Sequence, residues 1–354
     1  MQVIGRDTSG NVYVADRSNN RIRKVTAAGV LSTLAGSGTA GFANGRGTAA
    51  RFNRPTGVFV DSSGNVYVAD YYNNRIRRIT AAGVVTTLAG SGTRGHRDGI
   101  GTVARFNYPS DVAVDSAGDV YVADNLNHRI RKIEVAKAVT TLAGSGTADF
   151  ANGRGTAAQF NNPYGVAVDS AGNIYVADRE NHRIRKITAA GVVSTLAGSG
   201  TGGFANGRGA SARFKYPTGV VVDSAGNIYV ADEYNHRIRK IEVAKVVTTL
   251  AGNGREGHRD GTGAAARFKD PAGVAVDSAG NVYVADYGNH RIRKITAAGV
   301  VSTLAGSGTG GHRDGTGTAT WFYSPSGVAV DSAGNIYVAD RRNNRIRKME
   351  YRVP

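Results

Sequence analysis

Short apolar runs alternate with turn residues along the chain. A typical stretch reads Val166-Ala-Val168, a Ser-Ala-Gly-Asn turn, and then Ile174-Tyr-Val-Ala177. Two further runs follow, from Arg183 to Ile187 and from Val192 to Leu196, separated by a Gly-containing turn. Short runs rich in β-branched and aromatic residues, bounded by Gly and Asn, predict β-strands. Four such strands joined by turns predict a four-stranded antiparallel meander with the last strand outermost.

This meander recurs at a fixed period. The Asp that closes Tyr-Val-Ala-Asp returns every 54 residues, at Asp16, Asp70, Asp124, Asp178, Asp232, Asp286 and Asp340. A constant period of this length is typical of propellers and solenoids, and repeated meanders predict an all-β propeller with one blade per repeat. We expect a single domain, 1–354. Its approximate units are 1–54, 55–108, 109–162, 163–216, 217–270 and 271–324, with a partial unit at 325–354.

The number of blades follows from counting strands. The first three strands occur in seven copies, but the outer Thr-Leu-Ala-Gly strand occurs in six, at Leu34, Leu88, Leu142, Leu196, Leu250 and Leu304. We favour seven blades, with a last blade that is short of its outer strand, over six blades with surplus residues. An incomplete blade exposes a strand edge. Strand exchange or a dimer is therefore the alternative to the monomer that we favour.

A long connection links each outer strand to the next blade. It contains Ala-Gly-Ser-Gly-Thr, then either Phe-Ala-Asn-Gly or His-Arg-Asp-Gly, and then an Ala-rich piece long enough for one helical turn. Each Ala-rich piece ends in Phe, at Phe52, Phe106, Phe160, Phe214, Phe268 and Phe322. A connection of this length usually has its own packing or its own function. We expect the Phe to anchor it against the blade.

The phrase Gly165-Val-Ala-Val-Asp-Ser-Ala-Gly-Asn-Ile-Tyr-Val-Ala-Asp178, followed by Asn181-His-Arg-Ile-Arg-Lys-Ile187, resembles the NHL repeat. With its long connection, the unit is similar to the expanded NHL repeats of bacterial and teneurin-like chains. The resemblance covers essentially the whole sequence and implies the blade unit of an NHL β-propeller. It implies little about function, because one fold carries many different sites.

The chain is strongly basic, with a formal net charge of +17 from 44 basic and 27 acidic residues. Such a charge favours polyanionic partners, including nucleic acid and anionic glycans. The repeated Arg-Ile-Arg-Lys stretches, however, supply 21 of the 44 basic residues, so we expect many of these charges to form ion pairs between blades. The chain has no cysteine, which excludes disulfides and thiolate metal sites.

Two places vary strongly among the copies, while most other positions repeat. One is the dipeptide after Val-Ala-Asp, and the other flanks the proline that opens each unit; we call the two together the variable face. Because consecutive antiparallel strands turn at alternate ends, both places should lie at the same end of each blade. Eight of the nine tyrosines outside Tyr-Val-Ala-Asp fall there or beside it, with several arginines. The candidate binding residues are Arg17, Arg54, Tyr71, Tyr72, Tyr108, Tyr164, Arg179, Tyr216, Tyr234, Tyr287, Tyr323, Arg341 and Arg342.

Catalytic signatures are weak. The His of Asn-His-Arg is replaced by Asn in three copies, at Asn20, Asn74 and Asn344, which indicates a hydrogen-bonding residue. The Asp that ends Tyr-Val-Ala-Asp is expected to accept backbone N–H groups or an Arg of the next strand. Asp111 is the polar intruder in the first strands, where other copies hold Gly. We expect no catalytic residue, no metal site and no cofactor.

Four functional hypotheses remain. The first is a non-enzymatic binding or interaction scaffold that uses the variable face. The second is binding of single-stranded RNA or DNA, because aromatic rings interleaved with Arg and Lys suit base stacking. The third is a designed or recently amplified array with no evolved ligand. The last, and least favoured, is an enzyme such as a lyase or lactonase with a metal on the propeller axis.

Overall fold

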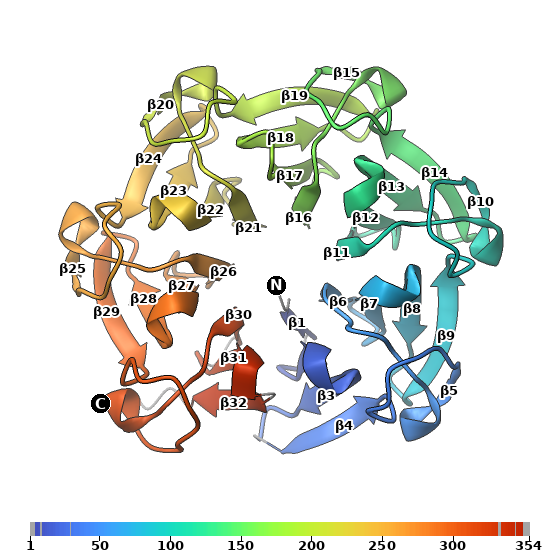
Figure 1. Cartoon of the computed structure of the whole chain (residues 1–354), viewed down its shortest axis with the longest axis horizontal. Coiled ribbons are helices and arrows are strands. Elements are labelled where there is room, and N and C mark those ends of the chain that lie inside the picture. Colours follow the sequence, from blue (N-terminus) through green and yellow to red (C-terminus); the bar gives the residue numbers. More distant parts are fainter. Residues whose placement is uncertain (1–3, 8, 29, 332–333, 344, 350–354) are drawn as a thin grey trace. The chain divides into compact units, whose positions relative to one another are not determined.

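A computed structural model of the chain describes residues 4–7, 9–28, 30–331, 334–343 and 345–349. Within them, the strands form seven antiparallel sheets, one for each copy of the repeat (Figure 1). The fold is therefore an all-β propeller type with seven blades, which confirms the count that the sequence favours over six.

The first two strands of each blade follow the predicted apolar runs. Five first strands begin at the opening proline: β11 (Pro109–Val114), β16 (Pro163–Val168), β21 (Pro217–Val222), β26 (Pro271–Val276) and β30 (Pro325–Val330). The other two are β1 (Ile4–Arg6) and β6 (Val58–Val60). All second strands end on the repeated Asp: β2 (Val12–Asp16), β7 (Val66–Asp70), β12 (Val120–Asp124), β17 (Ile174–Asp178), β22 (Ile228–Asp232), β27 (Val282–Asp286) and β31 (Ile336–Asp340).

The third and fourth strands complete the predicted meander. The third strands carry the Arg-Ile-Arg pattern: β3 (Arg21–Val25), β8 (Arg75–Ile79), β13 (Arg129–Ile133), β18 (Arg183–Ile187), β23 (Arg237–Ile241), β28 (Arg291–Ile295) and β32 (Arg345–Met349). The fourth strands are β4 (Leu31–Ala35), β9 (Val84–Ala89), β14 (Ala138–Ala143), β19 (Val192–Ala197), β24 (Val246–Ala251) and β29 (Val300–Ala305). The seventh sheet contains β30, β31 and β32 among the described residues.

The predicted four-stranded meander is present in five of the sheets with an addition: a fifth, two-residue strand lies outside the fourth. These strands come from the long connections: β5 (Gly45–Arg46), β10 (Gly99–Ile100), β15 (Gly153–Arg154), β20 (Gly207–Arg208) and β25 (Gly261–Thr262). In the third sheet, Gly99 pairs with Val139 and Ile100 with Ala138. An outer strand leaves backbone N–H and C=O groups unpaired, and the returning connection pairs some of them.

The predicted helical turn of each connection is a short 3₁₀ turn. These turns are η2 (Gly47–Ala49), η4 (Gly101–Val103), η6 (Gly155–Ala157), η7 (Gly209–Ser211), η9 (Gly263–Ala265) and η11 (Gly317–Ala319). The six Phe residues that follow are all fully buried. Their predicted role as anchors of the connection is therefore confirmed.

A second set of 3₁₀ turns, which the sequence does not predict, joins the second and third strands. They are η1 (Arg17–Asn19), η3 (Tyr71–Asn73), η5 (Asn125–Asn127), η8 (Glu233–Asn235), η10 (Tyr287–Asn289) and η12 (Arg341–Asn343). Each contains a variable dipeptide, which is therefore held in a defined conformation.

The described residues divide into two compact units. We call residues 2–180 with 186–194 the N-terminal unit, and residues 181–185 with 195–354 the C-terminal unit. In the N-terminal unit, Val120 and Val122 of β12 pack toward the second sheet, whereas Tyr121 and Ala123 pack toward the fourth. In the C-terminal unit, the fifth and sixth sheets share a core that includes Tyr229 and Val284. Since both faces of the second strands are covered, these strands are apolar at almost every position.

Candidate functional site

The repeated Asp fastens the two parts of the variable face to each other. In the third sheet, the Asp124 carboxylate accepts a hydrogen bond from the backbone N–H of Asn107, at 2.8 Å. The backbone N–H of Leu126, in the variable dipeptide, donates to the carbonyl of the same Asn107, at 3.1 Å. The turn after the second strand and the segment before the opening proline are thus side by side in one blade, as predicted.

In the first six blades, the His or Asn that follows the variable turn is hydrogen bonded to the next blade. His128 adopts a left-handed conformation (φ 53°), and its Nδ1 accepts the backbone N–H of Asn162 at 3.1 Å. Asn74 does the same with its Oδ1 for the N–H of Tyr108, also at 3.1 Å. Burial, and then Arg129, lower the pKa of His128, which favours the neutral imidazole that accepts this bond. The interpretation of this residue as a hydrogen-bonding group that Asn can replace is confirmed.

The N-terminal unit gathers six side chains of the variable face and its neighbourhood. We call Arg17, Arg54, Tyr71, Tyr72, Arg94 and Tyr108 the tyrosine cluster. The three rings contact one another, with centroids 5.2 Å apart for Tyr71 and Tyr72, 4.9 Å for Tyr71 and Tyr108, and 5.4 Å for Tyr72 and Tyr108. Contacts of this geometry contribute about 0.5–1.5 kcal/mol each beyond burial.

Each ring of the tyrosine cluster also carries a guanidinium. The Cζ of Arg17 lies 5.5 Å from the ring centroid of Tyr71, that of Arg54 5.2 Å from Tyr72, and that of Arg94 4.5 Å from Tyr108. Burial raises the pKa of Tyr71, against the lowering effect of Arg17. The raised pKa keeps the Tyr71 phenol neutral beside the Arg17 guanidinium.

The other candidate residues form smaller groups. In the N-terminal unit, Tyr164 lies under Arg179, whose guanidinium is also paired with Glu180 at 2.8 Å. In the C-terminal unit, Tyr216 contacts Tyr234, with centroids 5.1 Å apart. The remaining pairs are hydrogen bonded: Arg341 donates to the Tyr287 hydroxyl at 3.3 Å, and Arg342 to the Tyr323 hydroxyl at 3.2 Å.

Arg94 was missed by the sequence reasoning. It lies in the long connection, at a position that also varies among copies: Ala40, Arg94, Ala148, Gly202, Glu256 and Gly310. This variation is the signal that could have found it. In the C-terminal unit, Glu256 at the same position forms an ion pair with Lys269 at 3.2 Å, beside the opening proline. The position therefore belongs to the neighbourhood of the variable face.

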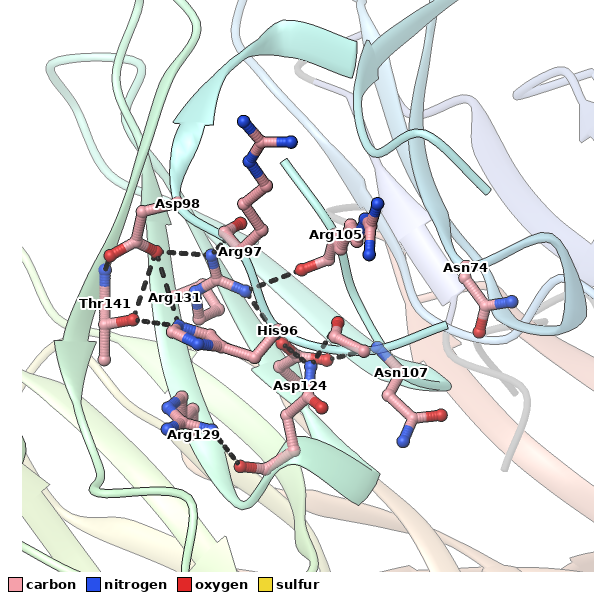
Figure 2. Close-up of polar contacts among 12 residues, drawn as sticks. Asn74, His96, Arg97, Asp98, Arg105, Asn107, Asp124, Arg129, Arg131 and Thr141 are labelled. Carbon is pink, nitrogen blue, oxygen red and sulfur yellow. Dashed lines mark hydrogen bonds and ion pairs between the residues drawn. The ribbon is translucent and has the colours of Figure 1, made fainter. Parts of the chain in front are cut away.

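The Arg residues of the repeat have a different role, shown in Figure 2. Arg131 is fully buried and donates to Asp124 at 2.9 Å, to Asp98 at 2.5 Å, and to the backbone carbonyls of Arg97 and Arg105 at 2.9 Å. All of these groups belong to the third sheet and its connection. The expectation of ion pairs between blades is thus wrong here, because the carboxylate partners lie within the same blade.

The two forms of the connection supply the same acceptor. Asn44, in a Phe-Ala-Asn-Gly connection, accepts from Arg77 at 2.8 Å, as Asp98 of His-Arg-Asp-Gly does from Arg131. The other conspicuous side chain of that connection, His96, has its Nε2 2.9 Å from the Thr141 hydroxyl. Burial raises the pKa of Asp124 to about 6, against the lowering effect of Arg131. The prediction that this Asp accepts a backbone N–H and an Arg is confirmed.

No group of three or more His, Cys, Asp or Glu side chains in the described ranges lies close enough together to hold a metal ion. None of the described helices has the length and apolar character that a membrane span requires.

The comparison with protein families decides the identity of the repeat. The family model for the NHL repeat matches six segments: 52–79, 106–133, 160–187, 214–241, 268–295 and 322–349. The chain is an NHL-repeat protein. Each match of this NHL propeller runs from the anchoring Phe to the end of the third strand, and so includes the variable turn.

Relatives of this NHL-repeat protein are much longer chains. It is 35% identical over 282 residues to the chloroplastic protein SUPPRESSOR OF QUENCHING 1 of Arabidopsis thaliana, covering 74% of this chain and 27% of that one. It is 31% identical over 326 residues to NHL repeat-containing protein 2 of Bos taurus (81% and 45%), and 26% identical over 359 residues to Teneurin-4 of Mus musculus (88% and 13%). The chain thus spans less than half of the length of each.

Solved structures resemble the NHL chain in fold alone. A streptogramin B lyase structure superposes with a TM-score of 0.66 at 13% identity, covering 98% of this chain and 91% of the other. An auxiliary nutrient binding protein from Bacteroides ovatus gives 0.61 at 15% identity, covering 98% and 97%. An enzyme and a binding protein share this architecture, so the function has to be argued from the site.

Proposed function

We propose that this NHL propeller is a non-enzymatic binding scaffold whose variable face recognises a polypeptide. The observation that carries the proposal is the tyrosine cluster, in which residues from two turns and two connections meet on an otherwise repeated framework. Tyr and Arg are enriched in the centres of protein interfaces, where they account for much of the binding energy. Tyr also offers a large contact area at a low cost in conformational entropy.

The chemistry of the candidate residues supports binding over catalysis. Phenols and guanidiniums predominate among them, and the His residues beside them accept backbone N–H groups through Nδ1. Nδ1 of each of those imidazoles is therefore already used as an acceptor for a backbone N–H. The buried carboxylates of the repeat likewise accept hydrogen bonds from Arg and from backbone N–H groups.

The experiment is a selection of displayed random peptides on the purified protein. The affinity of each recovered peptide is then measured for the wild type and for the variant Tyr72→Ser/Tyr108→Asn. Ser and Asn occupy these same positions in other copies, as Ser18 and Asn162, so the substitutions suit the local backbone. The matched control is Val135→Ala/Val243→Ala, which removes two exposed apolar side chains from turns between third and fourth strands.

The proposal requires peptides that bind the wild type and the control but not the tyrosine variant. Loss of two interface tyrosines should weaken the binding free energy of such a peptide by about 2 kcal/mol or more. Recovery of no peptide, or of peptides that bind all three proteins equally, would remove the variable face as the binding site.

A second candidate is single-stranded nucleic acid, which the net charge of +17 and the rings beside arginines favour. Binding of this kind releases counterions and weakens steeply as salt is added. A titration with oligo-uridine at several salt concentrations tests it. Absence of binding at low salt would exclude this candidate.

A further inference from the structure

The tyrosine cluster contains cations that no carboxylate neutralises. Arg54 and Arg94 are both exposed, and neither forms an ion pair with an acidic side chain among the described residues. Each is instead held on a phenol ring. Stacking fixes a guanidinium in place, so that less freedom is lost when it binds a ligand. The cluster is thus prepared to accept anionic groups.

Corresponding positions in other blades differ in charge. Arg179 is neutralised by Glu180 in the fourth blade, Glu233 begins the turn of the fifth, and Asp270 precedes the opening proline of the sixth. Glu256 replaces Arg94 and pairs with Lys269. Carboxylates therefore occur at these positions in the fourth, fifth and sixth blades, whereas the seventh blade has the cations Arg341 and Arg342.

The rings of the cluster are also occupied. Tyr71 contacts Arg17, Tyr72 and Tyr108, and Tyr108 contacts both tyrosines and Arg94. Nucleic-acid platforms of this kind need ring faces on which successive bases stack. Here each ring already carries a guanidinium, which favours a partner that binds through its anionic groups.

We propose that the tyrosine cluster binds an extended, acidic polypeptide segment with closely spaced Asp or Glu side chains. This inference rests on the proposed binding function and names its partner class. The guanidiniums of Arg54 and Arg94 pair with carboxylates, for which their planar donor groups are suited. The phenol edges and hydroxyls of Tyr72 and Tyr108 contact the peptide between those carboxylates.

The test measures binding of short fluorescein-labelled peptides. One alternates Glu with Tyr and Gly, a second has Gln in place of every Glu, and labelled oligo-uridine is the third probe. The protein variant is Arg54→Asn/Arg94→Ala, which installs the residues found at these positions in other copies, Asn162 and Ala148. The control, Arg154→Thr/Arg208→Thr, removes the same charge from the exposed arginines of β15 and β20 and installs the residue of β25.

The inference predicts that the Glu peptide binds the wild type and the control equally, and the cluster variant about ten-fold more weakly. The Gln peptide should bind at least ten-fold more weakly than the Glu peptide. If the Glu and Gln peptides bind the wild type equally, and both lose binding in the variant Tyr72→Ser/Tyr108→Asn, the acidic partner is overturned. The proposed binding function of the variable face would still stand. Tighter binding of oligo-uridine than of the Glu peptide, or an equal loss in both Arg variants, would also overturn the acidic partner.

Discussion

At the scale of single residues, the left-handed positions explain which side chains the repeat accepts. In the first six blades, the residue after the variable turn has φ between 51° and 56°, and residues such as Asn74 and His128 accept the backbone N–H of the next blade's connection. Asn tolerates the left-handed region better than most residues, and both Asn and His offer an acceptor two bonds from Cβ. This requirement accounts for the exchange of Asn and His among the copies.

Substitution of His128 tests the requirement. His128→Asn should change the free energy of unfolding by less than about 0.5 kcal/mol, whereas His128→Ala should lower it by about 1–3 kcal/mol, since the N–H of Asn162 loses its acceptor. Urea unfolding of the two variants measures the difference. Equal stability of the Asn and Ala variants would show that the hydrogen bond contributes nothing.

Asp111 is a carboxylate in a first strand, at a position where the repeat usually has Gly. Five other copies hold Gly there, at Gly57, Gly165, Gly219, Gly273 and Gly327. Its carboxylate is buried and accepts the N–H groups of Val112 and Val166, at 3.0 and 3.1 Å. Burial, against these hydrogen bonds, raises the pKa of Asp111 to about 7.

A raised pKa makes the folded state bind the proton more tightly than the unfolded state does. The stabilising contribution of Asp111 to the free energy of unfolding is therefore fully present below about pH 4 and is lost as the pH rises to about 7. Relative to Asp111→Asn, the wild type should lose up to about 4 kcal/mol across that range. Denaturant unfolding of both proteins at several pH values measures it, and a difference that is constant with pH would contradict the raised pKa.

At the scale of the blade, the buried Arg of the third strand joins three segments. Arg131 links the end of the second strand, the His-Arg-Asp-Gly connection and the segment before the anchoring Phe. Removal of one partner from a buried pair leaves the other charge uncompensated, which costs about 3–5 kcal/mol. Arg131→Met should destabilise the fold by that amount.

The matched control for Arg131→Met is Arg97→Met. Arg97 is exposed, and it contributes its backbone carbonyl rather than its side chain to the network. Its substitution removes the same charge and should change stability by less than about 0.5 kcal/mol. Thermal unfolding compares the two, and similar losses would argue for an effect of net charge.

The blade also shows what the sequence could predict and what it could not. The period, the apolar runs and the turn residues predicted the order of strands and the role of residues such as Phe106 and Asp124, because these depend on local pattern and burial. The pairing of Gly99 with Val139 was not predicted, since two residues carry no periodicity. The partner of Arg131 was misplaced because an ion pair within a blade and one between blades have the same sequence signature.

The candidate site follows the same division. Comparison of the copies located Tyr72 and Tyr108 and predicted that the two variable places lie at the same end of each blade, because meander geometry fixes which turns share an end. It missed Arg94, whose position varies but lies in a connection with no predicted path. The contacts among the rings depend on side-chain conformation in three dimensions, which the spacing of residues does not determine.

At the scale of the whole molecule, the net charge of +17 has two parts. Arginines such as Arg77 and Arg131 are neutralised inside the blades, whereas Arg54 and Arg94 of the tyrosine cluster form no ion pair with a carboxylate of the described residues. Binding of an acidic peptide through exposed guanidiniums should weaken several-fold when the ionic strength rises from about 0.05 to about 0.5 M. Fluorescence anisotropy at both salt concentrations measures the change, and an affinity independent of salt would contradict an ionic contact.

The central claim is that the variable face binds and that the repeated turns do not. Hydrogen–deuterium exchange of the protein with and without a selected peptide tests it most directly. We predict that the peptide slows exchange in residues 53–57, 71–74 and 107–111, which carry the tyrosine cluster. Slowed exchange confined to residues 115–119 and 134–137, at the other end of the same strands, would contradict the account.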